Sequence, residues 1–321
     1  MKTKKRIFSF ILGLLVMLSA LAVPNYDVKA ASISAPSAIY ELSAKGTQIV
    51  VAWTPVQGAV KYAVKLKVYG SSAYLASSNN IQSNKIIIKS NPGLKYSIEV
   101  SSIASDGSQS YPAYKIIYAA PAKPKNVYLR GWEPGTSKPS VQWAGYYGNT
   151  TGALYPDGYQ VQITTLSNKK IKTFTVKTTS FSDKQLSKIK NAGFKVKIRA
   201  YYTITNAKGP GKNLKVYSAW SGAKAFVPQP IMKAEYYRGD SNATFSWQPI
   251  KHAKSYGIYK VIQNGNNYKF VKYKTVAGSV TSTTVPLSLG KVTVLPVVKV
   301  GSKTYKSSTK DRMGFYGVNL Q

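Results

Sequence analysis

The sequence predicts an all-β chain of three tandem β-sandwiches behind an N-terminal export signal. A stretch at 53–62 begins with Trp and ends with Tyr, and it returns at 247–256 with Trp, Pro, a β-branched residue, Ala and Tyr at the same five places. A looser copy with a longer loop runs over 143–159. Around each copy, apolar and polar residues alternate with period two, as in half-buried strands. Each copy therefore predicts one strand that closes on an inward Trp and a next strand that opens on an inward Tyr.

Residues 1–30 are typical of a secretory signal. Lys2, Lys4, Lys5 and Arg6 form a charged start, an apolar run follows over 7–23, and 28–30 offers small or apolar residues at a cleavage position. The alternative is an uncleaved anchor, but the run is short for a span of about 20 residues and two serines interrupt it. We expect cleavage, export, and no transmembrane span in the mature chain.

Composition favours an anionic partner. The chain of 321 residues has 45 Lys and Arg, 10 Asp and Glu, no Cys and 25 Tyr. Removing residues 1–30 leaves 40 basic and nine acidic residues, a formal charge of +31 over 291 residues. A field of this size governs encounter with polyanions rather than fold. Without cysteines the exported modules must hold together by packing alone, and cysteine-zinc sites are excluded.

The first module shows the expected strand pattern most clearly. Apolar residues alternate over 49–53 and again over 62–68, where lysines occupy the outward positions. A turn at 91–95 then leads to Tyr96, just inside another alternating strand. A turn followed by such a tyrosine predicts a tyrosine corner, whose hydroxyl bonds to upstream backbone. In the second module we expect Val196 at the corresponding position, which leaves that corner in doubt.

Trp then Pro, Tyr on the next strand, and Pro-Gly-x-x-Tyr-x-x-x-Val at 92–100 resemble the fibronectin type III module, and the three-fold recurrence makes this resemblance specific. It implies seven-stranded, immunoglobulin-like sandwiches that serve as spacers and binding units. The expected boundaries are a signal peptide at 1–30 and modules at 32–119, 121–227 and 228–321, with linkers that contain proline.

The second module carries the candidate ligand site. A long loop at 144–158 holds Tyr146, Tyr147 and Tyr155, and a glycine-rich loop at 206–213 holds Lys208 and Lys212. These loops should emerge at the same end of the sandwich. Aromatic faces beside cations suit an acidic sugar or a polymer end, although the tyrosines could instead pack on their own loop.

Two further features of this module are structural expectations. A capping-box pattern at 182–185 predicts a short helical turn. The segment Tyr217-Ser218-Ala219-Trp220-Ser221 resembles the last-strand Ser-x-Trp-Ser pattern of several such modules, and Trp220 could stack on Arg199 by a cation–π contact. We expect a surface ladder there that stiffens the sheet.

The third module contains a hairpin signal and a short motif. Asn264-Gly265 predicts a tight turn between strands at 256–262 and 268–276. Arg238, Gly239 and Asp240 resemble the integrin-recognition tripeptide of fibronectin modules, which implies a host integrin as a further partner. Here the tripeptide lies before the Trp strand rather than before the last strand, and an ordinary turn that spells the motif by chance is the alternative.

No motif in the chain predicts an active site. The nine acids outside the signal are scattered, whereas a glycosidase needs two carboxylates held across one bond. The single histidine, His252, aligns with Gly58 in a turn, so we expect a solvated loop residue and no metal site. No Gly-x-Ser-x-Gly elbow is present. We therefore expect no enzyme activity, no cofactor and no metal.

The leading functional hypothesis is a non-enzymatic, exported adhesive or scaffold protein of the bacterial cell surface, secreted or held non-covalently at the wall. It would bind an anionic wall polymer or acidic glycan through outward cations, namely Lys65, Lys67, Lys195, Lys197 and Arg199. The alternative is a carbohydrate-binding accessory protein of an extracellular carbohydrate-active system. Nucleic acid stays a less favoured partner, because aromatics and cations together can hold single strands.

Overall fold

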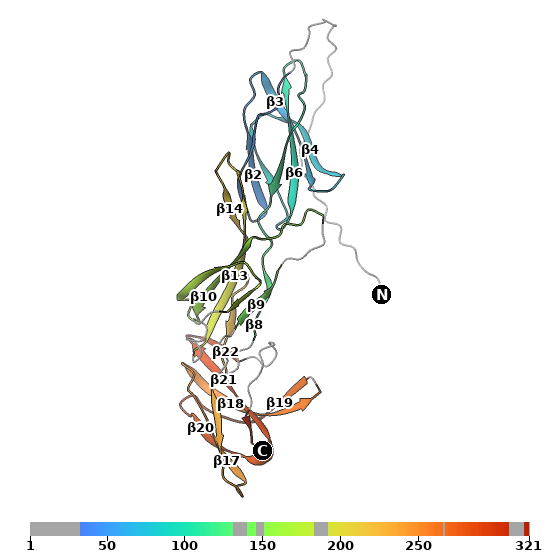
Figure 1. Ribbon diagram of the computed structural model, residues 1–321. Coiled ribbons are helices and arrows are strands. Elements are labelled where there is room, and N and C mark those ends of the chain that lie inside the picture. The colour runs from blue at the N-terminus through green and yellow to red at the C-terminus, as the bar shows by residue number, and fades with distance from the viewer. Residues whose placement is uncertain are drawn as a thin grey trace. The chain divides into compact units, whose positions relative to one another are not determined.

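The computed structural model describes residues 33–130, 140–145, 151–182, 192–265, 267–307 and 318–320. Its strands form six sheets, which pair as three sandwiches (Figure 1). The expected signal at 1–30, residues 183–189 of the expected helical turn, and the tyrosines at 146 and 147 lie outside the described residues. Within the described ranges, no helix has the length and apolarity needed to cross a membrane.

The first sandwich has the architecture that the alternation predicts. One sheet has the order β1-β2-β5 and the other has the order β4-β3-β6-β7, with antiparallel neighbours throughout. The strands are β1 (Ile39–Lys45), β2 (Gln48–Trp53), β3 (Ala59–Val68), β4 (Tyr74–Ile81), β5 (Lys85–Lys89), β6 (Lys95–Ala104) and β7 (Ala113–Tyr118). Seven strands in two facing sheets make an immunoglobulin-like sandwich.

The second sandwich repeats this order with sheets β8-β9-β12 and β11-β10-β13-β14, and β15 pairs with β13. Its strands are β8 (Lys125–Arg130), β9 (Ser140–Ala144), β10 (Gly158–Thr165), β11 (Lys170–Val176), β12 (Ser180–Ser182), β13 (Phe194–Ile204), β14 (Leu214–Tyr217) and β15 (Lys224–Phe226).

The third sandwich has sheets β16-β17-β20 and β19-β18-β21-β22, and β23 pairs with β21. Its strands are β16 (Met232–Glu235), β17 (Asn242–Trp247), β18 (Ala253–Asn264), β19 (Asn267–Ala277), β20 (Ser282–Pro286), β21 (Lys291–Val300), β22 (Lys303–Lys306) and β23 (Val318–Asn319), with a 3₁₀ turn η1 (Leu287–Leu289). The predicted hairpin joins β18 and β19, which pair as far as Asn264 and Asn267.

The repeated Trp and Tyr form the same contact in every sandwich. The ring pairs Trp53–Tyr62, Trp143–Tyr159 and Trp247–Tyr256 are edge-to-face, with centroids 5.3, 5.3 and 5.4 Å apart. All six side chains are buried. Edge-to-face pairs add to the free energy of area burial. The Trp and Tyr of the repeated stretch thus form a ring contact in the core of each sandwich, as the sequence predicts.

The turn inside the repeat is held by the tyrosine that follows it. The Tyr62 hydroxyl accepts a hydrogen bond from the Val56 N–H at 3.0 Å, and the Tyr256 hydroxyl accepts one from the Ile250 N–H at 2.7 Å. His252 is exposed there with φ of 62°, where Gly58 has φ of 84°. The predicted equivalence of His252 with a turn glycine is confirmed.

The predicted tyrosine corner of the first sandwich is present. The Asn91 N–H donates to the Tyr96 hydroxyl at 2.7 Å, and Tyr96 is 2% exposed. The expected equivalence of Val196 with Tyr96 is wrong. Tyr62 pairs with Ser102, and Tyr159 pairs with Ala200. Six residues before these two partners stand Tyr96 in the first sandwich and Phe194 in the second. Phe194, not Val196, is therefore the residue equivalent to Tyr96. Both residues face the core, which is why periodicity could not distinguish them.

Candidate functional site

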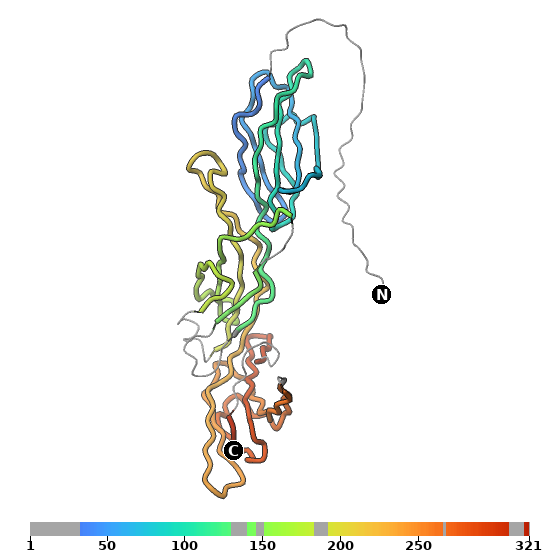
Figure 2. The backbone as a smooth tube through the Cα atoms, turned by 45° about the vertical axis from the view of Figure 1, so that its right-hand side comes forward, coloured from blue at the N-terminus to red at the C-terminus, as the bar shows by residue number. Residues whose placement is uncertain are grey.

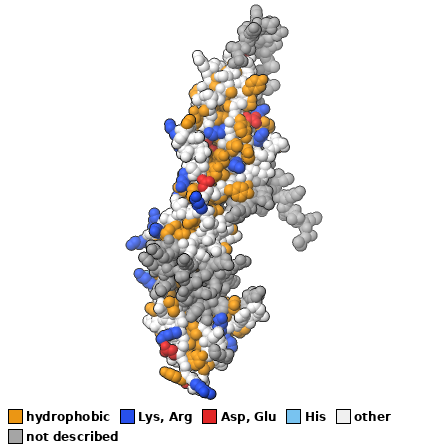
Figure 3. Space-filling model, viewed as in Figure 1, with side chains coloured by type: hydrophobic (Ala, Val, Ile, Leu, Met, Phe, Trp, Pro, Cys, Tyr) orange, Lys and Arg blue, Asp and Glu red, His pale blue; other side chains and the backbone are white. Residues whose placement is uncertain are grey.

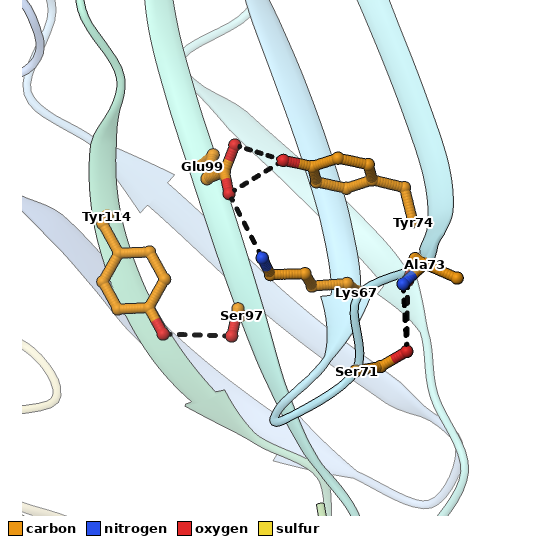
Figure 4. Close-up of polar contacts among 7 residues, drawn as sticks. All are labelled: Lys67, Ser71, Ala73, Tyr74, Ser97, Glu99 and Tyr114. Atoms are coloured by element: carbon orange, nitrogen blue, oxygen red, sulfur yellow. Dashed lines mark hydrogen bonds and ion pairs between the residues drawn. The ribbon is translucent and has the colours of Figure 1, made fainter.

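Polar and aromatic side chains gather on the solvent face of the sheet β4-β3-β6-β7. The Tyr74 hydroxyl donates to both carboxylate oxygens of Glu99, at 3.1 and 3.0 Å, and the Lys67 ammonium lies 3.8 Å from the same carboxylate (Figure 4). Lys65 and Lys67 approach the Tyr74 ring at 5.4 and 5.3 Å from its centroid. The hydrogen bond to Glu99 is the main cause that raises the pKa of Tyr74. One carboxylate thus fixes a tyrosine and a lysine on this face.

A hollow of about 420 Å³ opens beside this cluster. Ala63 and Ser101, which are paired across β3 and β6, are among its lining residues. Lys65 and Glu99 also line it, and the segment 109–112 contributes the rest of the wall. Its volume lies in the range of small-molecule sites. Sequence reasoning identified Lys65 here but missed the hollow, because a void depends on which residues lie opposite each other.

The second sandwich carries a ladder of cations and rings on its corresponding face. The Arg199 guanidinium lies 4.0 Å from the Tyr217 ring centroid and 4.6 Å from that of Trp220. Lys197 lies 4.9 Å from the Trp220 ring, and Arg199 Nε donates to Gln160 Oε1 at 2.9 Å. The predicted stacking of Trp220 on Arg199 is present. Such contacts fix the positions of cations without neutralising them.

Two serines attach the segment 218–221 to β13. Ser218 Oγ accepts from the Ala200 N–H and Ser221 Oγ accepts from the Ile198 N–H, both at 2.9 Å. The backbone N–H of each serine in turn donates to the carbonyl of the same β13 residue. These paired bonds position Trp220 between the two serines, over the row of cations. This arrangement explains the Ser-x-Trp-Ser pattern as a structural device.

Lys195 completes the row of outward cations on β13. Its ammonium donates to Asn168 Oδ1 at 2.8 Å and lies 5.4 Å from the Tyr305 ring centroid. Lys195, Lys197 and Arg199 alternate with buried core residues along the strand. In the described part of the chain, none of these three cations forms an ion pair. Alternate residues of a strand are about 6.7 Å apart, so the row spaces positive charges regularly.

The predicted ligand loops of the second sandwich pack on the first. The Lys95 N–H donates to the Gly152 carbonyl at 2.7 Å, and the Leu154 N–H donates to the Gly93 carbonyl at 2.8 Å. The hairpin between β13 and β14, yellow in Figure 2, places Ile204 and Ala207 in the core of the first sandwich. The described parts of these loops therefore contribute packing contacts with the first sandwich.

The candidate ligand residues that the structure describes on those loops, Tyr155, Lys208 and Lys212, lie at the surface. Lys208 and Lys212 are exposed at the tip of the hairpin, where the Lys208 N–H donates to the Lys212 carbonyl at 3.2 Å. Tyr155 is 55% exposed. The structure brings the two lysines together, but none of the contacts it shows joins Tyr155 to them. Tyr146 and Tyr147 lie outside the described residues.

Sequence reasoning missed a buried acid where the second sandwich meets the first. Glu41 on β1 is fully buried. Its Oε2 accepts from the Tyr118 N–H at 3.0 Å, whereas Oε1 has no hydrogen-bond partner among the described residues. Burial raises the pKa of Glu41 to about 8, opposed by the Tyr118 N–H and the charge of Lys115. The Glu41 N–H donates to the Ala207 carbonyl at 2.8 Å, so the acid belongs to the contact with the hairpin.

The tripeptide Arg238-Gly239-Asp240 lies in the exposed connection between β16 and β17. Gly239 has φ of 94°, and the Asp240 N–H donates to the Tyr237 carbonyl at 3.1 Å. Asp240 Oδ2 accepts from the Tyr237 N–H at 2.7 Å. The turn is therefore tight and solvent-exposed, and it already uses one oxygen of the carboxylate that an integrin would need.

Charge on the described surface is mostly basic. Figure 3 shows Lys and Arg side chains spread along the viewed face, with acidic side chains at isolated points. Among the described residues, no group of three or more His, Cys, Asp or Glu side chains could hold a metal ion.

The comparisons with known proteins find similar solved structures but no family model and no curated relative. The chain matches no protein-family model, and no curated protein sequence is significantly similar to it. The solved structures of the FN1–FN3 domains of chicken CNTN1 and of a two-domain fibronectin type III segment of chicken tenascin are similar to it, each at 15% identity with a TM-score of 0.30. The first similarity covers 89% of this chain and 98% of that one, and the second covers 60% and 98%. The chain is made of immunoglobulin-like sandwiches. At these scores the assignment rests on the strand pairings.

Proposed function

We propose that this chain is a non-enzymatic, exported adhesive or scaffold protein that binds anionic polymer, a wall polymer or an acidic glycan, through the basic faces of its sandwiches. The observation that carries the proposal is the row of cations on β13. Lys197 and Arg199 are held over rings, and no described carboxylate pairs with them. Cations that are fixed but not neutralised are complementary in charge to a polyanion. Because they are already held in place, little side-chain conformational entropy is lost on binding.

The whole-chain charge supports the same proposal. A formal charge of +35 comes from a shortage of acids as much as from an excess of lysines. A solvated surface needs no such imbalance, whereas attraction to polyanions does. The N-terminal segment 1–30 has the composition of an export signal, which would place the protein where wall polymers and glycans are available.

A four-lysine variant tests the proposal. Replacing Lys65, Lys67, Lys195 and Lys197 by Gln should weaken binding to immobilised polygalacturonate by about tenfold or more, because each lost cation removes a contact with the polymer. The matched control replaces the exposed Lys45, Lys85, Lys269 and Lys303 by Gln, which changes the net charge equally. Equal weakening in both variants would show that total charge rather than these faces governs binding.

Integrin recognition is a second candidate for the third sandwich, favoured by the exposed, tight turn that presents Arg238 and Asp240. Asp240→Glu moves the carboxylate by one methylene and keeps its charge. We expect this change to reduce attachment of integrin-bearing cells to surfaces coated with the full chain. Equal attachment of cells to both forms would show that integrins do not recognise this segment.

A further inference from the structure

Strand register identifies equivalent residues in the sandwiches. The repeated tyrosine pairs across the sheet with Ser102 in the first sandwich, where it is Tyr62, and with Ala200 in the second, where it is Tyr159. In both, the backbone N–H of that partner donates to a serine hydroxyl on the following segment at 2.9 Å. Two independent contacts thus set the same alignment, and the neighbouring pairs can be compared.

The next pair differs in size between the two sandwiches. In the second sandwich it is Gln160 with Arg199, and the guanidinium lies between two rings while its Nε bonds to the glutamine. In the first sandwich the pair is Ala63 with Ser101. The small side chains leave the hollow of about 420 Å³ where the second sandwich has its own arginine. The hollow is therefore a position that one repeat fills and the other leaves open.

The third sandwich also fills this position. Tyr256 pairs with Pro296, so the next pair is Gly257 with Leu295. The Tyr259 ring lies so close over Gly257 that an added Cβ would meet its Cε2 at 2.6 Å. Leu295 is only 8% exposed. Of the three equivalent pairs, all within the described residues, the first sandwich alone has no large side chain in the pair itself.

We propose that this hollow over Ala63 and Ser101 binds one carboxylated sugar residue of an acidic glycan. The inference rests on the anionic-polymer function proposed above and names the ligand unit that the first sandwich takes.

Four side chains of the lining, Lys65, Ser101, Gln109 and Tyr111, suit such a unit. Lys65 is exposed and has no ion pair in the described part of the chain, so its ammonium can donate a charge-assisted hydrogen bond to a sugar carboxylate. The side chains of Ser101 and Gln109 likewise make no hydrogen bond within the described residues, and they offer donors and acceptors to ring hydroxyls. Tyr111 is 92% exposed and presents an aromatic face to the apolar side of a sugar ring.

The neighbouring cluster fixes the edge of the hollow. Glu99 accepts both hydrogen bonds from Tyr74 and pairs with Lys67, so its carboxylate is held in place before a ligand arrives. A preorganised polar group loses less conformational entropy on binding than a free side chain. Because Lys67 pairs with Glu99, the lysine that lines the hollow without an ion pair among the described residues is Lys65.

The decisive variant fills the hollow with the residues of the second sandwich. Ala63→Gln combined with Ser101→Arg adds one positive charge yet removes the space. We expect calorimetry of the full chain with trigalacturonate to show affinity at least about tenfold weaker than for the unchanged chain. Retention on long polygalacturonate should be unchanged or stronger, because the other basic faces remain. A neutral trisaccharide should bind the unchanged chain more weakly than trigalacturonate does.

Tyr111→Ala provides a second variant that leaves the core intact, and we expect about tenfold weaker trisaccharide binding. Unaltered trigalacturonate affinity in the filled and Tyr111 variants would overturn the inference. So would a chain that retains polygalacturonate but binds no trigalacturonate, and in that case the proposed function would stand. A chain that retains no long polymer would instead defeat the proposed function itself.

Discussion

Raising the pH from about 5 to about 9 should lower the free energy of unfolding of the first sandwich by on the order of 4 kcal/mol. The cause is Glu41, whose pKa is raised from 4.5 to about 8 by burial. The native state holds this proton more tightly than the unfolded state. The stabilisation is therefore fully present below about pH 4.5 and is lost as the pH rises towards 8. Urea unfolding followed by tryptophan fluorescence at a series of pH values measures the loss.

Glu41→Gln provides the control, because the amide keeps the shape and can accept the Tyr118 N–H but does not titrate. Its stability should vary little over the same range. Burial lowers the pKa of Lys115, which interacts with the charge of Glu41. A lowered lysine pKa has the opposite sign, because the unfolded state then binds the proton more tightly, so this group cannot cause a loss of stability as the pH rises. Tyr202, stacked on Tyr118, has a pKa raised to about 12 and stays neutral in the range. Identical pH profiles for the variant and the unchanged chain would contradict this role of Glu41.

Trp247→Ala should destabilise the third sandwich by about 3–5 kcal/mol, because truncating a buried aromatic side chain removes its transfer free energy and leaves a cavity. Trp247 is 5% exposed and packs edge-to-face on Tyr256. The first two sandwiches keep their own Trp–Tyr pairs and should unfold as before. Calorimetry of the full chain should then show one transition moved to lower temperature.

The matched control is Tyr237→Ala, which removes an aromatic side chain that is 84% exposed in the same sandwich. It should change stability by no more than about 0.5 kcal/mol. If Trp247→Ala lowered every transition equally, the three Trp–Tyr pairs would not define separate cores.

Most of the fold could be predicted from the repeated stretch. Trp, Pro and Tyr at fixed spacing predict a strand, a turn and a facing strand, because their roles are local: a ring contact and a hydroxyl that holds the turn. The stacking of Arg199 on Trp220 was also predictable, since Ser-x-Trp-Ser places the ring at a known position on the neighbouring strand.

The candidate site could not be predicted because the sequence pattern does not fix which residues of the sandwiches are equivalent. Equating Tyr96 with Val196 rather than Phe194 keeps every residue on its correct face, because the period of a strand is two. It nevertheless equates Ser101 with Tyr201 instead of Arg199, so the vacant position does not show in the sequence. Glu41 was missed for a different reason: its burial comes with packing of a hairpin from more than 150 residues further along the chain, near Ala207.

The measurement that tests the central claim most directly is the affinity of the full chain for long polygalacturonate as a function of salt. Fixed cations that contact a polyanion release counterions or are screened as salt rises. The account predicts that the binding constant falls at least about tenfold between roughly 50 mM and roughly 300 mM salt, with a shallower slope for the variant lacking Lys65, Lys67, Lys195 and Lys197. An affinity that does not change with salt, or no binding at low salt, would contradict it.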